Sequence, residues 1–317
     1  MEVQELMESL SLLEYRNFEV IIVEDGSSDT CKTQVDKYQH MMDLQYFFKA
    51  NTGPGDSRNF GATKATGDYL IFFDSDCLIP SNYLTVVNES LASNPLNVFG
   101  GPDRAHPDFS EVQKAISYAM TSLLTTGGIR GHRNAASRFQ PRSFNMGVDR
   151  HVFSKVRGFA NLHPGEDPDL VYRLSKQGFT IGLISEAFVY HKRRIDLNKF
   201  SIQVYKFGLA RTILMKWHSD SRKIVFWLPT LLLIAGIALL VIGFQQSYAW
   251  WAVLIGLLVI LLDAISTTRS ITTAMLGTVA TIVQVISYGW GFVKGWWYLH
   301  LLGKDPKIQF PGMFKGP

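Results

Sequence analysis

The sequence predicts an α/β domain built on a mostly parallel sheet, followed by a tail of membrane-spanning helices. Two observations lead to this prediction. Short apolar runs typical of strands alternate with helical patterns over the first 190 residues, an order typical of a parallel sheet covered by helices on both faces. The tail contains long apolar segments, and the run at 224–244 has no charge, so it is long enough to cross about 30 Å of hydrocarbon.

Composition excludes several classes of protein. Hydrophobic residues make up 47% of the 317 residues, and only two are cysteines. Such a chain is neither disordered nor held together by a disulfide framework. The net charge of +4 is not spread evenly, because residues 191–223 hold nine Lys/Arg and two Asp/Glu. A single basic segment in an otherwise slightly acidic chain does not predict a nucleic-acid-binding protein.

The charge pattern divides the chain into four parts. We expect a catalytic domain at 1–195, a basic amphipathic segment at 196–223, two to three transmembrane helices at 224–300 and a tail at 301–317. The basic segment would lie on anionic lipid. An ordinary helix that caps the catalytic domain is an equally good interpretation of its sequence.

The apolar tail contains three candidate spans, Ile224–Phe244, Ala249–Ile265 and Ile271–Phe292. The alternative for a single run of this kind is a buried helix of a soluble protein, which does not suit the first run and stays open for the third. Cations ahead of the first span predict that the N-terminal domain lies in the cytoplasm, at a bacterial inner membrane.

The side of the C-terminus stays open in this interpretation. Three spans would place Lys304, Lys307 and Lys315 outside, against the tendency of basic residues to stay in the cytoplasm. The alternative is that the aromatic cluster Trp296–Tyr298 marks a helix that re-enters the membrane or lies along its surface.

Acidic residues follow several of the expected strands. The expected strands are 18–23, 44–48, 69–73, 98–100, 180–184 and 187–191, with helices at 57–65 and 168–177. Ligands of parallel α/β sheets bind at the carboxyl ends of the strands. Asp74 and Asp76 follow the third strand at a spacing of two, which would place them on one face. Two carboxylates at a strand end suit a hard divalent cation that also binds phosphate.

Three further segments carry candidate functional residues. The loop Asn51–Asn59 is rich in glycine and leads into a helix, an arrangement that lets backbone approach an anionic ligand. Residues Glu166, Asp167 and Asp169 stand at the start of a helix, and capping explains only one of them. One of the others could act as a general base. His191 ends a strand and is a candidate third metal ligand.

Five motifs in this order resemble glycosyltransferase family 2, the inverting enzymes with the GT-A fold. They are Ile21–Asp29, Gly53–Asn59, Phe73–Asp76, Gly165–Asp167 and Val189–His191. The resemblance covers residues 18 to about 210. It implies a GT-A-like sheet, a nucleotide-sugar donor carrying UDP or GDP, and Mg²⁺ or Mn²⁺.

The resemblance also implies roles for individual residues. Asp167, with Glu166 beside it, would deprotonate the acceptor hydroxyl. Asp74, Asp76 and His191 would hold the metal, and Asp74 would also serve the ribose. The implied nucleotide-sugar contacts are Asp25, Gly26, Ser27, Gly55, Arg58, Asn59 and Asp74. Asn145–Gly147 matches the region of the family that faces donor sugar and acceptor.

Two departures from the family pattern matter. The family normally opens with a central strand that lines the nucleotide pocket, whereas residues 3–13 have a helical pattern. We therefore expect the sheet to lack that strand, either because Met1 is a misplaced start or because the gene is truncated. The Gln-x-x-Arg-Trp sequence of processive synthases is absent, which favours transfer of a single sugar.

The sequence therefore predicts an integral membrane glycosyltransferase whose acceptor is a glycan or a lipid-linked intermediate, in lipid-linked glycan or cell-surface polysaccharide assembly. The alternative is a non-catalytic, membrane-bound remnant of such an enzyme. A nucleotide-dependent oxidoreductase is disfavoured because the glycine spacing of the dinucleotide fingerprint is absent.

Overall fold

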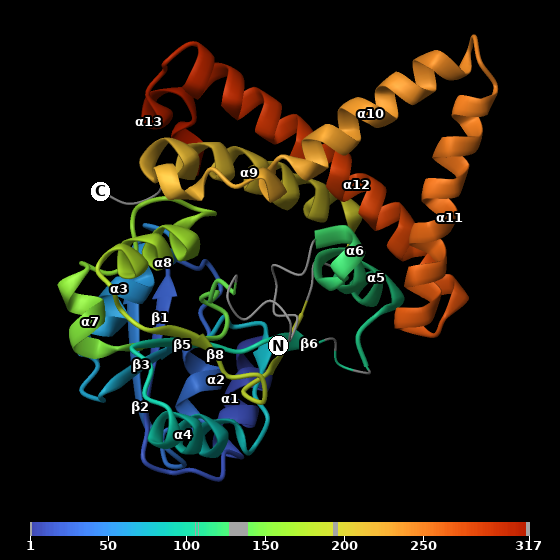
Figure 1. The fold of residues 1–317 in the computed structure, drawn as a ribbon. Helices are drawn as coiled ribbons and strands as arrows, with labels where there is room; N and C mark the ends of the chain where they lie inside the picture. The colour runs from blue at the N-terminus through green and yellow to red at the C-terminus, as the bar shows by residue number, and fades with distance from the viewer. Residues whose placement is uncertain (1, 105, 107, 127–138, 193–195, 315–317) are drawn as a thin grey trace. The chain divides into compact units, whose positions relative to one another are not determined.

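The computed structural model describes residues 2–104, 106, 108–126, 139–192 and 196–314. The chain divides into two compact units (Figure 1). The first contains the described residues up to Arg104 and from 139 to His191, with Phe314. The second contains the described part of 105–132 and Lys192–Met313.

The first unit is an α/β domain, as predicted. Its elements are α1 (Glu2–Ser11), β1 (Glu19–Asp25), α2 (Lys32–Asp36), β2 (Asp43–Lys49), α3 (Pro54–Lys64), β3 (Tyr69–Phe72), β4 (Cys77–Leu78), α4 (Tyr83–Ser93), β5 (Val98–Gly100), β6 (Asp103–Arg104), β7 (Met146–Asp149), α7 (Arg150–Lys155), α8 (Glu166–Lys176), β8 (Ile181–Leu183) and β9 (Val189–His191). All six expected strands are present within a few residues. The short strands β4, β6 and β7 were not predicted.

The strands form three small sheets. The largest has the order β3-β7-β5-β8, and β7 runs antiparallel to both β3 and β5. Because β5 and β8 are parallel, the other three strands of this sheet share one direction. β1 pairs with β2 in parallel. The third sheet has the order β4-β9-β6 and places His191 opposite Cys77.

Helices cover both faces of the largest sheet, and the alternation of side chains along β3 shows why. Leu70 and Phe72 point into a core shared with α7 and α8, whereas Tyr69 and Ile71 pack on the other face. That second face is covered by α1 and α4, through residues such as Met7 and Tyr83. Because all four residues of β3 are apolar and successive side chains point to opposite faces, both faces of the sheet need a covering of helices.

A cavity of about 990 Å³ separates β1 from β3. Residues of both strands line it, together with residues of α1, α3 and α4. Among the described strands, β1 pairs only with β2, and β3 only with β7. Glu19 Oε1 accepts hydrogen bonds from the amides of Thr66 (2.6 Å) and Gly67 (2.9 Å). The start of β1 therefore lies beside the start of β3, and the two strands line the cavity in the same direction.

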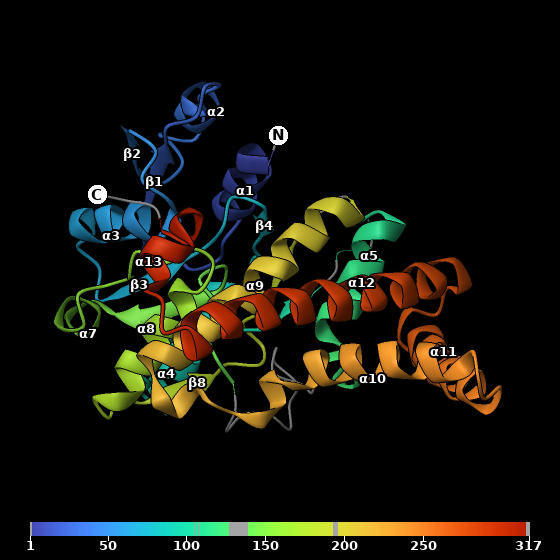
Figure 2. The same ribbon diagram turned by 90° about the horizontal axis from the view of Figure 1, so that it is seen from above.

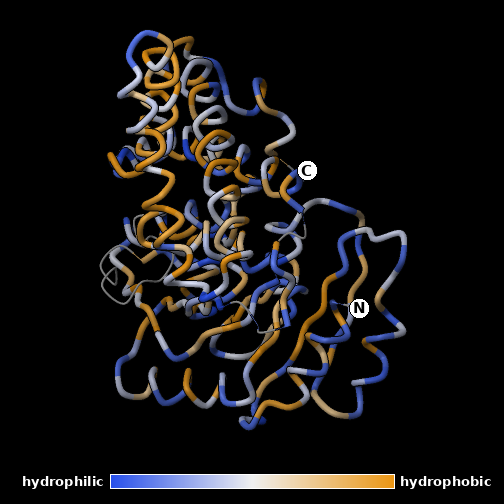
Figure 3. The backbone as a smooth tube through the Cα atoms, turned by 90° about the vertical axis from the view of Figure 1, so that its right-hand side faces the viewer, coloured by the Kyte–Doolittle hydropathy of each residue, from blue (hydrophilic) through white to orange (hydrophobic). Residues whose placement is uncertain are grey.

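The second unit is helical. It contains α5 (Glu111–Thr121), α6 (Leu123–Thr126), α9 (Leu197–Trp217), α10 (Leu228–Gly243), α11 (Tyr248–Thr268), α12 (Ile271–Trp296) and α13 (Pro306–Gln309). Figure 3 shows hydrophobic colouring along many of its turns. Only α11 and α12, the latter continued as a π-helical turn to Leu301, are long and apolar enough among the described helices to cross a membrane.

The first expected span is shorter than predicted. The apolar run 224–244 was expected to form one helix of 21 residues, but Ile224–Phe226 forms a 3₁₀ turn and α10 has only 16 residues. Pro229 lies in the first turn of α10. Because proline lacks a backbone N–H and fits the first turn of a helix, it favours a helix that begins there.

The segment expected to be basic and amphipathic forms α9, which packs along α12. Contact is close because α12 presents glycines: a Cβ on Gly291 would lie 2.2 Å from the Tyr205 carbonyl oxygen, and one on Gly295 would lie 2.1 Å from Thr212 Oγ1. Arg211 of α9 is buried, with its guanidinium 3.6 Å from the centre of the Phe226 ring. One face of α9 is therefore a helix-packing face.

The cavity beside β1 predicts uneven protection from hydrogen exchange. β1 is paired along one edge and β7 along both, so β1 amides that face the cavity lack a ladder partner. We expect a peptide covering 19–25 to exchange distinctly faster than one covering 146–149 in hydrogen–deuterium exchange mass spectrometry. Equal protection of the two strands would contradict an open edge at β1.

Candidate active site

Arg58 on α3 joins three parts of the first unit. Its Nη2 lies 2.6 Å from Asp74 Oδ1, in the turn after β3, and its Nη1 lies 3.3 Å from Glu166 Oε1, in the first turn of α8. The ring of Phe159 lies 5.6 Å from the guanidinium carbon. The Arg58 side chain is only 14% exposed. A buried guanidinium with two carboxylates is held in one geometry, because moving either partner would leave an unpaired charge.

Asp74 and Asp76 do not share a strand face. β3 ends at Phe72, and both aspartates lie in the turn between β3 and β4. The prediction from a spacing of two along a strand was therefore wrong in its geometry. In the turn their side chains have different partners, Asp74 with Arg58 and Asp76 with His191.

Glu166 and Asp167 begin α8, whose N-cap is Gly165 at φ 133°. His163 Nδ1 lies 2.9 Å from Glu166 Oε1, and Glu166 Oε2 accepts a hydrogen bond from the Gly165 amide. Asp167 Oδ1 is buried and has no hydrogen-bond partner among the described residues. A buried carboxylate oxygen without a partner is costly, which is typical of groups kept for function.

The two neighbouring acids have opposite pKa shifts. Burial, and after it the negative charge of Glu166, raise the pKa of Asp167 to about 6, and the charges of Arg58 and Arg142 only partly oppose this rise. Burial also raises the pKa of Glu166, but the hydrogen bond and charge of His163, with the charge of Arg58, bring it below the usual value. Asp167 is therefore the carboxylate whose pKa suits a general base near neutral pH.

Asp74 stays ionised for a different reason. Burial raises its pKa, but the positive charge of Arg58, with a contribution from His191, outweighs burial and lowers the pKa below the usual value. Three acids thus face one arginine, and the site has an excess of negative charge when Asp167 is ionised.

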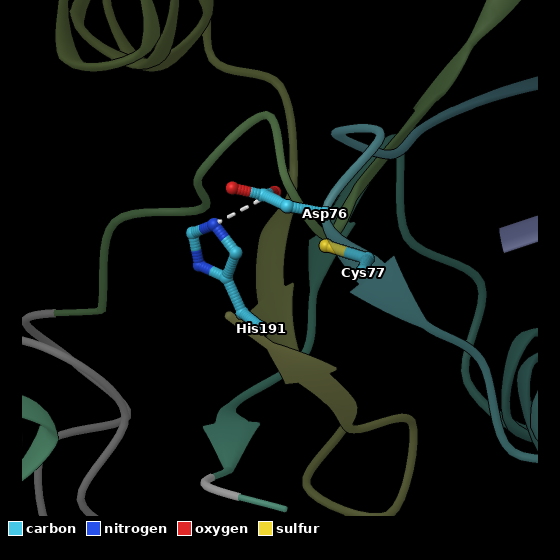
Figure 4. A group of neighbouring side chains, drawn as sticks. All are labelled: Asp76, Cys77 and His191. Atoms are coloured by element: carbon cyan, nitrogen blue, oxygen red, sulfur yellow. Dashed lines mark ion pairs between the residues drawn. The ribbon is translucent and has the colours of Figure 1, made fainter. Parts of the chain in front are cut away.

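A second cluster adjoins Asp74 (Figure 4). His191 Nε2 on β9 lies 3.2 Å from Asp76 Oδ1, and the ligand atoms of Asp76, Cys77 and His191 all lie within 4.8 Å of one another. The ring of His191 stacks on Phe144, with 4.5 Å between ring centres. Pairing of β4 with β9 brings Cys77 and His191 opposite each other.

The donor chemistry of this cluster fits a divalent ion. Carboxylate oxygen and imidazole nitrogen are ligands that Mn²⁺ accepts, whereas Mg²⁺ prefers oxygen alone. The thiol of Cys77 is fully buried and donates to the Phe144 carbonyl oxygen at 3.6 Å, and a buried thiol engaged in this way is a poor ligand. Asp76 and His191 could therefore hold an ion and leave its other positions to ligand oxygens and water.

Asp25 lies at the end of β1, where its carboxylate holds the glycine-rich loop. Oδ1 accepts from Lys49 Nζ (2.7 Å) and the Thr52 amide (2.9 Å), and Oδ2 accepts from the Gly53 amide (2.8 Å). Burial raises the pKa of Asp25, but the Lys49 hydrogen bond and these amides lower it below the usual value. Its observed partners make Asp25 an anchor for this loop.

Four other predicted nucleotide-sugar contacts, at Gly26, Ser27, Gly55 and Asn59, lie against other groups of the protein. Gly26 has φ 73°, and a Cβ there would lie 2.7 Å from the Asn51 nitrogen, so only glycine fits. Ser27 donates to Glu24. A Cβ on Gly55 would extend to 3.2 Å from the Ala160 carbonyl oxygen. Asn59 exchanges two hydrogen bonds, of 2.9 and 2.8 Å, with the backbone of Phe159.

The structure thus brings together Arg58, Asp74, Glu166 and Asp167, and it places Asp76 with His191. It does not bring Asp25 into contact with them, and Asp74 does not belong to the cluster of Asp76. Sequence reasoning missed Lys49, although Asp25 and Lys49 are register partners at the ends of β1 and β2. It also missed His163, which lies outside every motif used.

The fold and this cluster define a GT-A-like α/β domain with acidic groups at the carboxyl ends of its strands. The chain aligns with a mannosyltransferase of Pyrobaculum calidifontis, whose structure is a complex with GDP-Man and Mn²⁺. The TM-score is 0.63 at 14% identity, over 91% of this chain and 83% of the other. At this identity the likeness concerns the fold alone.

Sequence comparison identifies the family. The profile of glycosyl transferase family 2 matches residues 2–156, and the chain belongs to that family through its N-terminal half. An uncharacterized glycosyltransferase of Rickettsia bellii is 35% identical over 88 residues, which are 28% of this chain and 13% of that one. The succinoglycan biosynthesis protein ExoA of Rhizobium meliloti is 25% identical over 215 residues, 66% of this chain and 63% of ExoA. The alignments thus span less than two thirds of either relative.

Removing the central cation should destabilise the first unit. Arg58→Met would remove the arginine that pairs with both Asp74 and the nearly buried Glu166, at a cost of about 3 kcal/mol in the free energy of unfolding. The matched control is Lys32→Met, which breaks a pair with Asp36 whose side chains are 57% and 40% exposed and should cost less than about 1 kcal/mol. Chemical unfolding of both variants measures the difference. Equal losses would contradict the central role of Arg58.

Proposed function

We propose that this chain is an inverting glycosyltransferase that moves a sugar from a nucleotide-diphosphate sugar to an acceptor hydroxyl. The observation that carries the proposal is the environment of Asp167. It is a buried carboxylate with an unpartnered oxygen and a pKa raised to about 6, at the edge of a cluster that contains a buried arginine. Membership of glycosyl transferase family 2 supports this reaction class.

The reaction needs a base and stabilisation of the leaving group. Asp167 accepts the proton of the acceptor hydroxyl while the hydroxyl oxygen bonds to the anomeric carbon of the sugar. The bond from that carbon to the diphosphate breaks in the same step, so the configuration inverts without a covalent enzyme intermediate. Arg58, paired with Asp74 and Glu166, lies where it can stabilise the charge that develops on the leaving diphosphate.

A divalent ion, Mg²⁺ or Mn²⁺, is part of the proposal. Asp76 and His191 would hold it, and the bound ion would neutralise charge on the diphosphate oxygens. The Mn²⁺ in the structure of the Pyrobaculum mannosyltransferase supports a metal of this kind. The mixed nitrogen and oxygen ligands favour Mn²⁺ over Mg²⁺.

The donor side of the site is proposed from the loops that Asp25 and Asn59 hold. The Gly53 amide is already bound to Asp25, but the first turn of α3 beyond Pro54, at Gly55 and Asp56, is a helix N-terminus, where an anion binds favourably. The nucleotide would be UDP or GDP, with Asp25, Gly26, Ser27, Gly55 and Asn59 shaping its pocket. GDP-Man in the mannosyltransferase structure supports a nucleotide sugar as donor.

The acceptor would be a glycan or a lipid-linked intermediate at the cytoplasmic face of the membrane, in lipid-linked glycan or cell-surface polysaccharide assembly. The similarity to a protein named for succinoglycan biosynthesis and the two apolar helices α11 and α12 support this setting. The alternative is a non-catalytic, membrane-bound remnant. The cavity beside β1 favours that alternative, because an open edge next to the site weakens the frame that positions Asp25.

Replacing the proposed base separates binding from transfer. Asp167→Asn should abolish transfer of radiolabelled sugar from a panel of nucleotide sugars to purified membranes, yet preserve thermal protection by UDP or GDP. The matched control is Asp169→Asn, two residues further along α8, whose carboxylate pairs with Arg173 at 2.8 Å; this variant should retain transfer. A variant of Asp167 that retains transfer would contradict the proposal.

The raised pKa of Asp167 also predicts a pH dependence. Because the base must be ionised, kcat/KM should fall as the pH drops below about 6. Folding has the opposite dependence. Asp167 binds its proton more tightly in the folded chain than in the unfolded chain, where its pKa is near 3.8. The contribution of Asp167 to the free energy of unfolding is therefore highest below pH 3.8 and falls as the pH rises from there through about 6. Relative to Asp167→Asn, the native protein should therefore lose stability between these values, which a thermal-shift series would measure.

The metal site makes a separate prediction. Asp76→Asn should remove the Mn²⁺-dependent part of the protection by UDP or GDP, because it removes the only carboxylate of the Asp76–Cys77–His191 cluster. Cys77→Ala should retain that part, since the thiol donates to a carbonyl. Protection that depends on Mn²⁺ to the same extent in Asp76→Asn and the native protein would place the metal elsewhere.

A further inference from the structure

The apolar helices α10 and α11 form a hairpin. Four residues, 244–247, connect them, and Trp250 Nε1 donates to the Gly243 carbonyl oxygen at 2.8 Å across the turn. Most of the large apolar side chains of the hairpin are exposed. They are Leu228, Leu231, Leu232, Ile234, Ile237, Leu240, Val241, Ile242, Tyr248, Trp250, Trp251, Leu254, Ile255, Leu258, Val259 and Leu262. Only 11% of the most apolar part of α11 is buried. A surface of this kind fits the interior of a lipid bilayer.

Charge is found only at one end of this hairpin. Arg222 and Lys223 precede α10, and Arg269 follows α11. The connection at the opposite end contains Gln245 and Gln246 but no charged residue. Basic residues at both feet of a hairpin, and none at its tip, are expected when both feet lie at the same membrane surface.

Asp263, the one acid within the hairpin helices, lies at the charged end. Its Oδ2 accepts hydrogen bonds from the Tyr118 hydroxyl (2.7 Å) and from Ser122 Oγ (2.8 Å), in and just after α5. It is six residues from Arg269. The carboxylate is therefore bound at the foot of the hairpin, where α5 meets α11, and does not lie deep in the apolar segment.

One face of α12 is apolar and exposed along its whole length. The residues of this stripe follow one another at steps of three or four, and they are Ile271, Met275, Val279, Ile282, Ile286, Trp290, Val293, Trp297 and Leu301. Such steps place them on a single side of the helix. A helix with one apolar stripe and a covered opposite side is suited to lie along a membrane surface.

The opposite side of α12 is formed by small residues that pack on α5 and α9. A Cβ on Gly277 would lie 2.9 Å from the ring of Tyr118, and Cβ atoms on Gly291 and Gly295 would lie even closer to atoms of α9. Figure 2 shows α12 between α9 and α10. At the far end, Lys216 Nζ of α9 donates to the Lys304 carbonyl oxygen at 2.7 Å. α12 and α9 therefore form one body over the length of α9.

This packing decides how α12 can meet a bilayer. α9 carries four cations, Lys199, Lys206, Arg211 and Lys216. If α12 crossed the membrane, α9 would enter with it, and each cation near the bilayer centre would cost about 3 kcal/mol or more. If α12 lies along the surface, the four cations of α9 need not enter the hydrocarbon.

We propose that the α10–α11 hairpin enters and leaves the bilayer through one face, and that α12 lies in that face with its apolar stripe toward lipid. The segment after α12 then stays on the side of the N-terminal domain. Arg222, Lys223, Arg269, Lys304 and Lys307 all fall on that side. Sequence length alone allowed α12 as a third span, which would place Lys304 and Lys307 on the opposite side.

Single cysteines in the full-length protein test this topology independently of enzymatic activity. In a Cys31→Ser/Cys77→Ala background, Gln39→Cys marks the first unit, Lys307→Cys the segment after α12, and Gln245→Cys the hairpin tip; all three positions are exposed. The probe is a membrane-impermeant maleimide applied to sealed vesicles of each orientation. We expect Gln39→Cys and Lys307→Cys to be labelled in the same vesicles, and Gln245→Cys not to be labelled in them.

Two results would overturn the proposal. Labelling of Gln39→Cys and Lys307→Cys in vesicles of opposite orientation would show that α12 crosses the membrane. Labelling of Gln245→Cys together with Gln39→Cys would show that the hairpin is not inserted. Neither result bears on sugar transfer, so failure of the topology and failure of the proposed function are distinguishable.

Discussion

The ion pairs of Arg58 hold the candidate site together. One guanidinium on α3 connects the turn after β3 with the first turn of α8, so the positions of Asp74 and Glu166 depend on the same cation. With Asp167 ionised, the three acids outnumber Arg58 by two negative charges. A divalent cation beside Asp76 would reduce this excess, and electrostatic attraction alone therefore favours its binding.

The contrast between Glu166 and Asp167 shows how adjacent residues of one helix come to differ chemically. Glu166 has His163 and Arg58 as partners, which keep its pKa low, whereas Asp167 is buried next to that negative charge and its pKa rises. Divergent pKa values in a carboxylate pair are a common basis for distinct roles. Glu166 acts as a fixed counter-ion of Arg58, and Asp167 is the group that can exchange a proton.

Much of this architecture could be predicted from the sequence, because strands such as 98–100 are apolar runs bounded by polar turns. β7 could not, since a four-residue strand containing Gly147 has no recognisable period. The pairing of Asp76 with His191 depends on contacts between β4 and β9, which lie over 100 residues apart in the chain. The role of Lys49 could have been predicted, because it occupies the same position in β2 as Asp25 in β1. The short length of α10 could also have been predicted, because Pro229 favours a helix that begins there.

Central to this account is the proposed metal site, in which Asp76 and His191 would hold a divalent ion that would neutralise charge on the donor diphosphate. Pulsed electron paramagnetic resonance of protein-bound Mn²⁺ with UDP or GDP tests it directly. We expect a ¹⁴N coupling from the His191 imidazole together with a ³¹P coupling from the nucleotide, and loss of the ¹⁴N coupling in His191→Ala. A spectrum with ³¹P coupling but no ¹⁴N coupling in the native protein would contradict this site.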